Sequence, residues 1–146
     1  MRAGELGAIQ VAFNILRQEA KNQLFREATK NSVGIIAREP LANGFLAGKL
    51  KAESTFSKGD IRHNFPPDYI SQLTLAADQL RFLESNSRTL AQAALRLILD
   101  HKDISTVIPG AKTPEQVDED LASSELPSLT GEELLRIKFL REQAFA

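Results

Sequence analysis

The chain has 146 residues, about the length of one ordinary domain. With 42% apolar and 25% charged residues it cannot be a disordered tail or a collagen-like repeat, and without cysteine it cannot be a disulfide scaffold. Eighteen basic and nineteen acidic residues give a net charge of −1, so no electrostatic feature favours binding to nucleic acid or to an anionic membrane.

No segment has the composition of a membrane anchor or a leader. Apolar runs are all far shorter than the roughly 18 residues that a membrane span needs, and the first ten residues lack the apolar centre of a signal peptide. We therefore expect a single domain over residues 1–146 with a cytoplasmic location.

The N-terminal third has the pattern of a strand, a helix and a second strand. Ile9–Leu16 alternates apolar with polar residues, which predicts a strand with Gln10 and Asn14 on one face. Residues 19–29 have helical apolar spacing, and Val33–Ala37 is an almost wholly apolar run, typical of a strand buried on both faces. This order predicts a βαβ unit with two parallel strands.

A long loop rich in glycine and proline follows, from Arg38 to Pro67. Loops of this length inside a compact domain are uncommon and are often functional, so we expect a lid or a binding loop. Helical spacing resumes from Asp68 to Glu84.

A further helix is predicted to begin at Thr89, which is suited to the N-cap position. Its polar residues Gln92, Arg96 and Asp100 form one stripe with four-residue spacing, and its other positions are largely apolar, so we expect it to be mostly buried. Ile104–Ile108 is the third predicted strand.

Two capping boxes mark the starts of the last two helices, one at Thr113–Gln116 and one at Thr130–Glu133. The final helix carries Leu134, Ile137 and Leu140 on its predicted apolar face. Three buried strands alternating with about five helices predict an α/β fold with a parallel sheet.

Two segments could carry chemistry. Pro109–Lys112 joins the third strand to a capped helix, where backbone N–H groups, a glycine and a lysine suit a phosphate; an ordinary capped turn with a solvated lysine is the simpler interpretation. Pro40–Lys49 follows the second strand, at the edge of a parallel sheet where ligands bind, but a plain loop would also fit.

Three stretches in this order resemble the C-terminal half of the aldo-keto reductases. IQVAFNIL is similar to the sixth strand of that family, GIIAREPLANGFLAGKL to the seventh strand and its loop, and STVIPGAKTPEQVDEDL to the eighth strand and the next helix. The resemblance implies a partial (β/α)8 barrel of about three parallel strands. It also implies a parent reaction in which NADPH reduces aldehydes or ketones.

The resemblance assigns nicotinamide and pyrophosphate contacts to the first two strands and the loop. Gln10 matches the glutamine that hydrogen-bonds the nicotinamide carboxamide, and Arg38 stands where many members have an aromatic residue stacked on the ring. A planar guanidinium can also stack. The residues that resemble the loop around the pyrophosphate are Pro40, Leu41, Ala42, Lys49 and Arg62.

The third strand and its helix resemble the site for the adenosine end of the cofactor. The matching residues are Gly110, Lys112, Thr113, Gln116, Glu119 and Asp120. Lys112 and Thr113 favour NADPH over NADH. Asp120 replaces the amide of a family Glu-Asn pair that contacts adenine, and an ionised aspartate accepts hydrogen bonds without donating them.

The resemblance also implies that the proton donor, a tyrosine tuned by lysine, aspartate and histidine, belongs to the first half of the barrel, which this chain does not match. The only tyrosine, Tyr69, has no motif around it, and His63 and His101 lack metal-ligand spacing. We therefore expect no catalytic residue, no metal site and no activity of the chain alone. Two alternatives are a non-catalytic module that senses NADPH or complements a separate N-terminal half, and a structural remnant without a ligand.

Three parallel strands cannot close a barrel, so the sheet should keep open edges with apolar flanks. This predicts a homo-oligomer, with two halves facing each other, or a marginally stable monomer. In the alternative arrangement the loop from Ala47 to Pro67, or the terminal helix, covers the open edge. The carbonyl substrate is left open.

Overall fold

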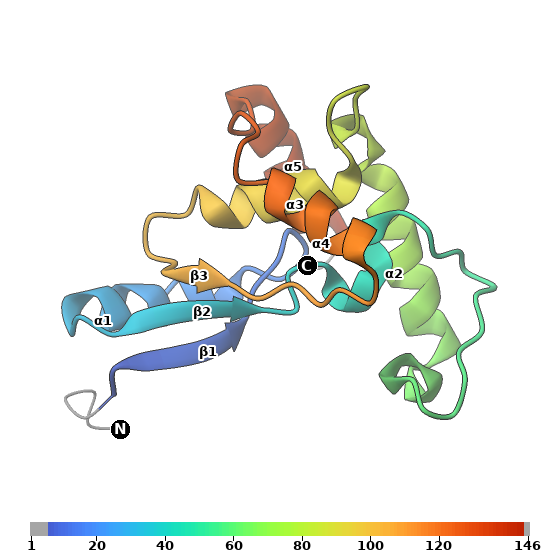
Figure 1. The fold of residues 1–146 in the computed structure, drawn as a ribbon, viewed down its shortest axis with the longest axis horizontal. Coiled ribbons are helices and arrows are strands. Elements are labelled where there is room, and N and C mark those ends of the chain that lie inside the picture. Colours follow the sequence, from blue (N-terminus) through green and yellow to red (C-terminus); the bar gives the residue numbers. More distant parts are fainter. Residues whose placement is uncertain (1–5, 145–146) are drawn as a thin grey trace.

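A computed structural model of the chain describes residues 6–144. Its centre is a sheet of three parallel strands in the order β1 (Ala8–Ala12), β2 (Gly34–Arg38) and β3 (Thr106–Val107), shown in Figure 1. Ala8 pairs with Gly34 at one end of the β1–β2 ladder, and Ala37 pairs with Val107 in the short β2–β3 ladder. The expected α/β fold with three parallel strands is confirmed.

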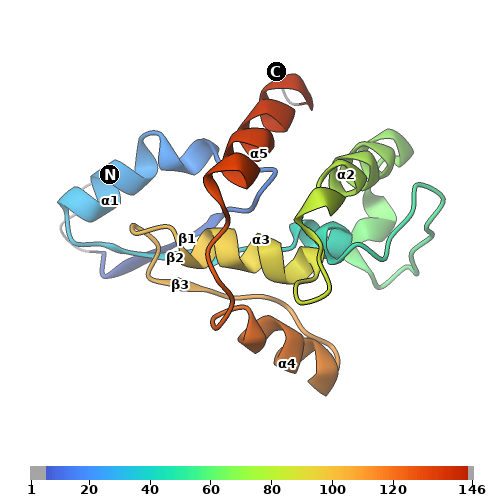
Figure 2. The ribbon, with the colours of Figure 1, turned by 90° about the horizontal axis from the view of Figure 1, so that it is seen from above.

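Helices surround the sheet on more than one side. Figure 2 shows α1, α2 and α5 on one side of the strands and α4 on the other. The described α-helices are α1 (Leu24–Lys30), α2 (Pro67–Gln79), α3 (Leu90–Leu99), α4 (Pro114–Ala122) and α5 (Gly131–Ala144). The shorter 3-10 helices are η2 (Glu19–Lys21), η3 (Ala42–Ala47), η4 (Ile61–Asn64) and η5 (Arg81–Leu83).

The first strand is shorter than the alternating pattern predicts. It ends at Ala12 because the buried side chain of Asn14 accepts hydrogen bonds from the backbone N–H groups of Leu16 (3.0 Å) and Arg17 (2.9 Å), which turns the chain away from the sheet. The third strand keeps only Thr106 and Val107 of the predicted Ile104–Ile108.

Three other predicted boundaries also differ. The helix expected over residues 19–29 is divided into η2 and α1, and the helix expected to reach Glu84 ends at Gln79, with η5 following. The loop from Arg38 to Pro67 is not structureless, because η3 and η4 lie within it. A short 3-10 helix lacks the periodicity that would reveal it in sequence.

The apolar core consists of two clusters. The larger one contains Phe45, Leu83 and Leu90 and lies between η3, α2, α3 and α5. The smaller one joins the sheet to α1 and the end of α3. On α5, Ile137 is buried as expected, but Leu134 is 45% exposed, so the apolar face of this helix is narrower than predicted.

His101 packs its ring against two buried phenylalanines, Phe13 and Phe25, with ring centroids 5.6 and 5.1 Å away. This burial lowers the pKa of His101. The negative charge of Asp103 raises that pKa in part, and the positive charges of Lys21 and Lys102 lower it further. Since the unfolded chain then binds the proton more tightly than the folded one, the free energy of unfolding should fall as pH drops through about 6.5.

We expect this pH dependence to be weaker in His101→Phe, which keeps an aromatic ring and removes the titrating group. Urea denaturation between pH 7.5 and 5.5 measures it, with His63→Gln, a substitution of an exposed histidine, as the control. An unchanged slope in His101→Phe would exclude His101 as its source.

In the described part of the chain, no helix combines the length and apolarity that crossing a bilayer requires. The same residues contain no cluster of three or more metal-ligating side chains.

Candidate functional site

A cavity of about 590 Å³ lies between the loop after β2 and the turn from β3 into α4. The two segments that the sequence singled out, Pro40–Lys49 and Pro109–Lys112, therefore share one opening. Nine of the thirteen predicted site residues line it: Pro40, Leu41, Lys49, Arg62, Gly110, Lys112, Gln116, Glu119 and Asp120.

The other four predicted residues lie outside the cavity lining. Gln10 and Arg38 are exposed on the same face of the sheet, because Gln10 pairs with Ile36, which lies two residues before Arg38 on β2. Arg38 forms an ion pair with Glu39. Ala42 is buried in the larger core cluster, and Thr113 caps α4 beside the lining residue Lys112. The structure thus separates the predicted nicotinamide contacts from the predicted phosphate contacts.

The backbone after β2 takes an unusual path. Glu39, Ala42 and Asn43 have φ angles of 55°, 47° and 56°, and Gly44 follows with 91°. For residues other than glycine this left-handed conformation costs about 1–2 kcal/mol each, so the surrounding contacts must hold it. One such contact is the buried side chain of Asn14, whose Nδ2 donates to the Glu39 carbonyl oxygen at 2.9 Å.

Arg62 connects the far end of the long loop to this backbone. Its Nη1 donates to the Asn43 carbonyl oxygen (3.2 Å), its guanidinium lies 4.4 Å from the Phe56 ring centre, and Nε and Nη2 donate to Asp60. A Cβ at Gly44 would lie 3.2 Å from Arg62 Nη1, so glycine permits this approach. Hydrogen bonds from Arg62 hold the pKa of Asp60 well below its usual range. The charge of Arg62 is therefore already balanced within the chain.

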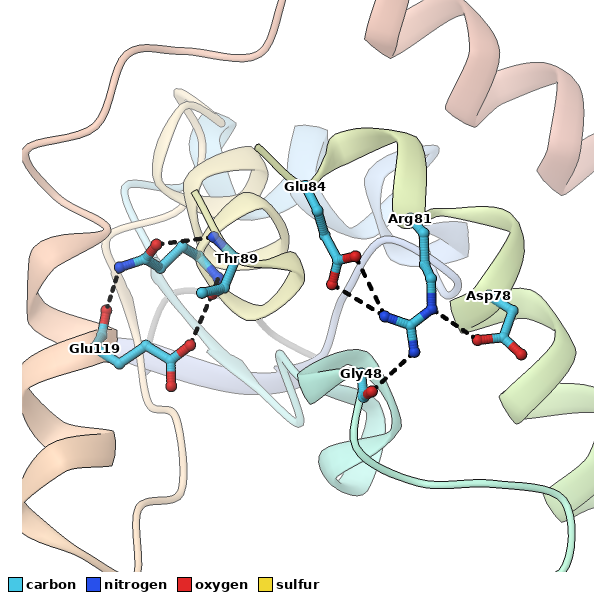
Figure 3. Close-up of polar contacts among 7 residues, drawn as sticks. Gly48, Asp78, Arg81, Glu84, Thr89 and Glu119 are labelled. Carbon is cyan, nitrogen blue, oxygen red and sulfur yellow. Dashed lines mark hydrogen bonds and ion pairs between the residues drawn. The ribbon is translucent and has the colours of Figure 1, made fainter. Parts of the chain in front are cut away.

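A second arginine fixes the end of η3. Arg81 Nη2 donates to the Gly48 carbonyl oxygen at 2.9 Å, while Nε and Nη1 bind Asp78 and Glu84, as Figure 3 shows. Gly48 has a φ of 70°, and Lys49, the next residue, lines the cavity. Arg81 thus holds the backbone from which Lys49 extends.

At the start of α4 the hydrogen bonds differ from the predicted capping box. Thr113 Oγ1 accepts from the Gln116 N–H (3.3 Å) as expected, but Gln116 Oε1 accepts from the Lys112 N–H (2.6 Å) instead of the Thr113 N–H. The box therefore includes the residue before the N-cap. This contact orders the backbone of Lys112 at the cavity wall.

The charges of the lining suit an anion on one side. Among the residues that the structure describes, neither Lys49 nor Lys112 forms an ion pair, whereas Arg62 does. A Cβ at Gly110 would meet nothing within 4 Å, so a ligand can approach that backbone closely. On the other side burial, and then the charge of Glu119, raise the pKa of Asp120. The two lysines and the open backbone at Gly110 fit phosphate groups. The carboxylates of Glu119 and Asp120 line the other side of the cavity.

Sequence reasoning missed the lining residues Glu39, Asp60 and Ile108, and it included Asn43 and Gly44 only as members of the Pro40–Lys49 segment. Two of them had a usable signal: asparagine tolerates the left-handed conformation that residue 43 adopts, and Asp60 precedes the selected Arg62 by two residues. Glu39 and Ile108 had none, because only the strand directions place them at the opening.

Comparisons with known proteins show the family of the chain. The model of the Aldo/keto reductase family matches residues 5–142, and the chain belongs to that family. The chain is 25% identical over 125 residues to aldo-keto reductase yakc [NADP(+)] of Schizosaccharomyces pombe (81% of this chain, 37% of that protein). It is 28% identical over 127 residues to the NADH-specific methylglyoxal reductase of Escherichia coli K12 (84% of this chain, 38% of that protein).

Solved structures give the same result. The glycerol dehydrogenase AKR11B4 of Gluconobacter oxydans superposes with a TM-score of 0.79 at 26% identity, over 94% of this chain and 43% of that one. The chain therefore spans about two fifths of the length of the relatives it matches. Its open three-stranded sheet is part of an aldo-keto reductase barrel.

Proposed function

We propose that this chain provides the phosphate-binding part of the cofactor site of an NADPH-dependent carbonyl reductase. The observation that supports this most directly is the single cavity that joins Pro40, Leu41 and Lys49 to Gly110 and Lys112. When bound, the nicotinamide cofactor would supply the hydride for carbonyl reduction. In this interpretation Lys49 and Lys112 balance phosphate charge.

The remaining predicted contacts follow the shape of an extended dinucleotide. Glu119 and Asp120 would face the adenine end, and Thr113 and Gln116 would order the backbone beside the phosphate at Lys112. Gln10 and Arg38, on the open face of the sheet, would receive the nicotinamide. We propose these roles from the family resemblance, since the cavity itself reaches neither Gln10 nor Arg38.

We also propose that the chain alone does not catalyse reduction. No tyrosine or histidine is among the described residues that line the cavity. Tyr69 packs edge-on against Phe65 at 5.4 Å, and His63 Nδ1 lies 2.9 Å from the Phe56 carbonyl oxygen, so both side chains have structural contacts. Loss of a general acid costs a factor of about 10² to 10⁴ in rate.

Titration of the chain with NADPH, followed by cofactor fluorescence, tests the binding proposal. We expect micromolar binding that Lys112→Ala weakens by about five- to thirtyfold, because one charge-assisted hydrogen bond is lost. Lys102→Ala, at an exposed lysine outside the cavity, is the matched control. No binding up to millimolar NADPH, or equal binding by Lys112→Ala, would refute the phosphate site.

The same titration with NADH, which lacks the 2′-phosphate of NADPH, shows whether Lys112 contacts that phosphate. If Lys112 contacts the 2′-phosphate, Lys112→Ala should weaken NADPH binding and leave NADH binding nearly unchanged. A panel of aldehydes with NADPH tests the second proposal, and turnover clearly above a buffer blank would contradict it.

The second candidate function is partner binding, which the open sheet favours. β1 and β3 are the two edges of the described sheet, and backbone groups on a free edge can pair with another chain. We propose a homo-oligomer or complementation by a separate N-terminal half, in the cytoplasm. Light scattering that shows a stable monomer at high concentration would count against self-association.

A further inference from the structure

Helix α4 forms one wall of the cavity but is hardly anchored by apolar packing. It contributes Gln116, Glu119 and Asp120 to the lining, yet none of its residues is buried. Its larger apolar side chains, Val117 and Leu121, are 44% and 66% exposed. Since apolar burial is the main source of helix docking energy, another interaction must hold α4 in place.

The N-cap residue of α3, Thr89, and two residues of its polar stripe, Gln92 and Arg96, provide that interaction. Thr89 Oγ1 donates to Glu119 Oε1 at 2.7 Å, a contact visible in Figure 3, and Gln92 Nε2 donates to the Glu119 carbonyl oxygen at 3.3 Å. One turn further along, Arg96 Nη1 donates to the Ser124 carbonyl oxygen at 2.9 Å, just beyond the end of α4. We refer to these three contacts, of Thr89, Gln92 and Arg96 with Glu119 and Ser124, as the α4 seam.

Two of the seam residues also cap α3. Gln92 Oε1 accepts from the Thr89 N–H (3.0 Å), and Thr89 Oγ1 accepts from the Gln92 N–H (3.2 Å). Both side chains therefore use their acceptor atoms for the start of their own helix and their remaining donors for Glu119. Arg96 is braced in a similar way, by an ion pair with Asp100 on its own helix. Gln92 and Arg96, four residues apart on α3, therefore contact α4 at Glu119 and the chain just after it at Ser124.

We propose that the α4 seam sets the position of α4 and thereby the affinity of the cavity for a dinucleotide, so that Thr89, Gln92 and Arg96 are positioning residues. The effect on affinity rests on the proposed function, whereas the effect on α4 does not. Because the seam consists of a few partly exposed hydrogen bonds, α4 opens locally without unfolding of the core.

Gln92→Glu isolates the seam from the cap. A glutamate at this position still accepts the Thr89 N–H, as in an ordinary capping box, but it cannot donate to the Glu119 carbonyl oxygen and adds a charge beside the Glu119 carboxylate. Arg96→Met removes the contact with Ser124, together with the ion pair to Asp100, and leaves the Thr89–Gln92 cap intact. Thr89→Ser retains every contact, and Gln72→Glu places the same charge change at an exposed position of α2 outside the cavity lining.

Amide hydrogen exchange of the chain without ligand reports on α4 directly. In Gln92→Glu and Arg96→Met we expect exchange over residues 114–122 to be at least about fivefold faster, with residues 90–99 unchanged. In NADPH titrations the same two variants should bind about five- to tenfold more weakly. Thr89→Ser and Gln72→Glu should match the unmodified chain in both measurements.

The two readouts separate the possible failures. Unchanged exchange over 114–122 in both variants overturns the seam, as does an equal rise over 90–99, which would show a general loss of stability. Faster exchange in α4 with unaltered NADPH binding overturns the positioning role. If the unmodified chain binds no NADPH, the proposed function fails and the role in affinity with it, while faster exchange would still support the seam as the anchor of α4.

Discussion

Replacing Phe13 by alanine should lower the free energy of unfolding by about 3–5 kcal/mol, the usual cost of deleting a fully buried phenylalanine ring. Phe13 is 0% exposed and its ring centroid lies 5.0 Å from that of Phe25. It follows β1 directly and joins the sheet to α1 through the smaller core cluster. Urea denaturation followed by far-UV circular dichroism measures the change.

The matched control is Phe139→Ala on α5, where the ring is 57% exposed. We expect that substitution to change the free energy of unfolding by less than about 0.5 kcal/mol. If the two variants differed by less than about 1 kcal/mol, the smaller cluster would not be a cooperative part of the core.

Asn14→Leu should destabilise the fold by about 2–4 kcal/mol, although both side chains branch in the same way at Cγ. The side chain of Asn14 makes three hydrogen bonds, to the Leu16 N–H, the Arg17 N–H and the Glu39 carbonyl oxygen. Leucine would leave the Leu16 N–H without a partner, at about 1–3 kcal/mol for a buried group. The Arg17 N–H and the Glu39 carbonyl oxygen would each lose one hydrogen bond but keep a backbone partner, the Asn14 carbonyl oxygen and the Ala42 N–H. Thermal and urea denaturation measure the loss.

The same substitution should also disturb the cavity, because Asn14 holds Glu39 in its left-handed conformation beside Pro40. We expect the Asn14→Leu chain, at a temperature where it remains folded, to bind NADPH more weakly than the unmodified chain. Asn22→Leu, at an exposed position before α1, is the control for stability and binding. Equal stability of Asn14→Leu and Asn22→Leu would show that these hydrogen bonds do not contribute.

Local sequence patterns predicted correctly the features that depend on residues close together in the chain. Thr89 caps α3 as predicted and forms a capping box with Gln92, and Thr130 with Glu133 forms the last predicted box. The apolar run around Ile35 becomes the central strand of the sheet. The expected burial of both faces is not found, because Ile35 and Ala37 are buried on one face whereas Ile36 on the other is only partly buried. The family resemblance, carried by three stretches of the sequence, is confirmed by the match over residues 5–142.

Predictions failed where a distant contact competes with the local pattern. Alternation through Asn14 predicts a continuing strand, but the side chain bonds to backbone groups on both sides of the turn, and β1 ends at Ala12. Gln116 has the right spacing to close a box on Thr113, yet its side-chain oxygen accepts from the Lys112 N–H instead.

By itself, the sequence determined the order of strands and helices, the helix starts and the family, because apolar periodicity and capping depend on residues a few positions apart. Only the tertiary structure decided that Lys49 and Lys112 share an opening, that Gln10 and Arg38 lie outside it, and that the stripe of α3 holds α4. These facts depend on where side chains far apart in the chain meet, and spacing along the sequence does not encode the direction in which each element packs.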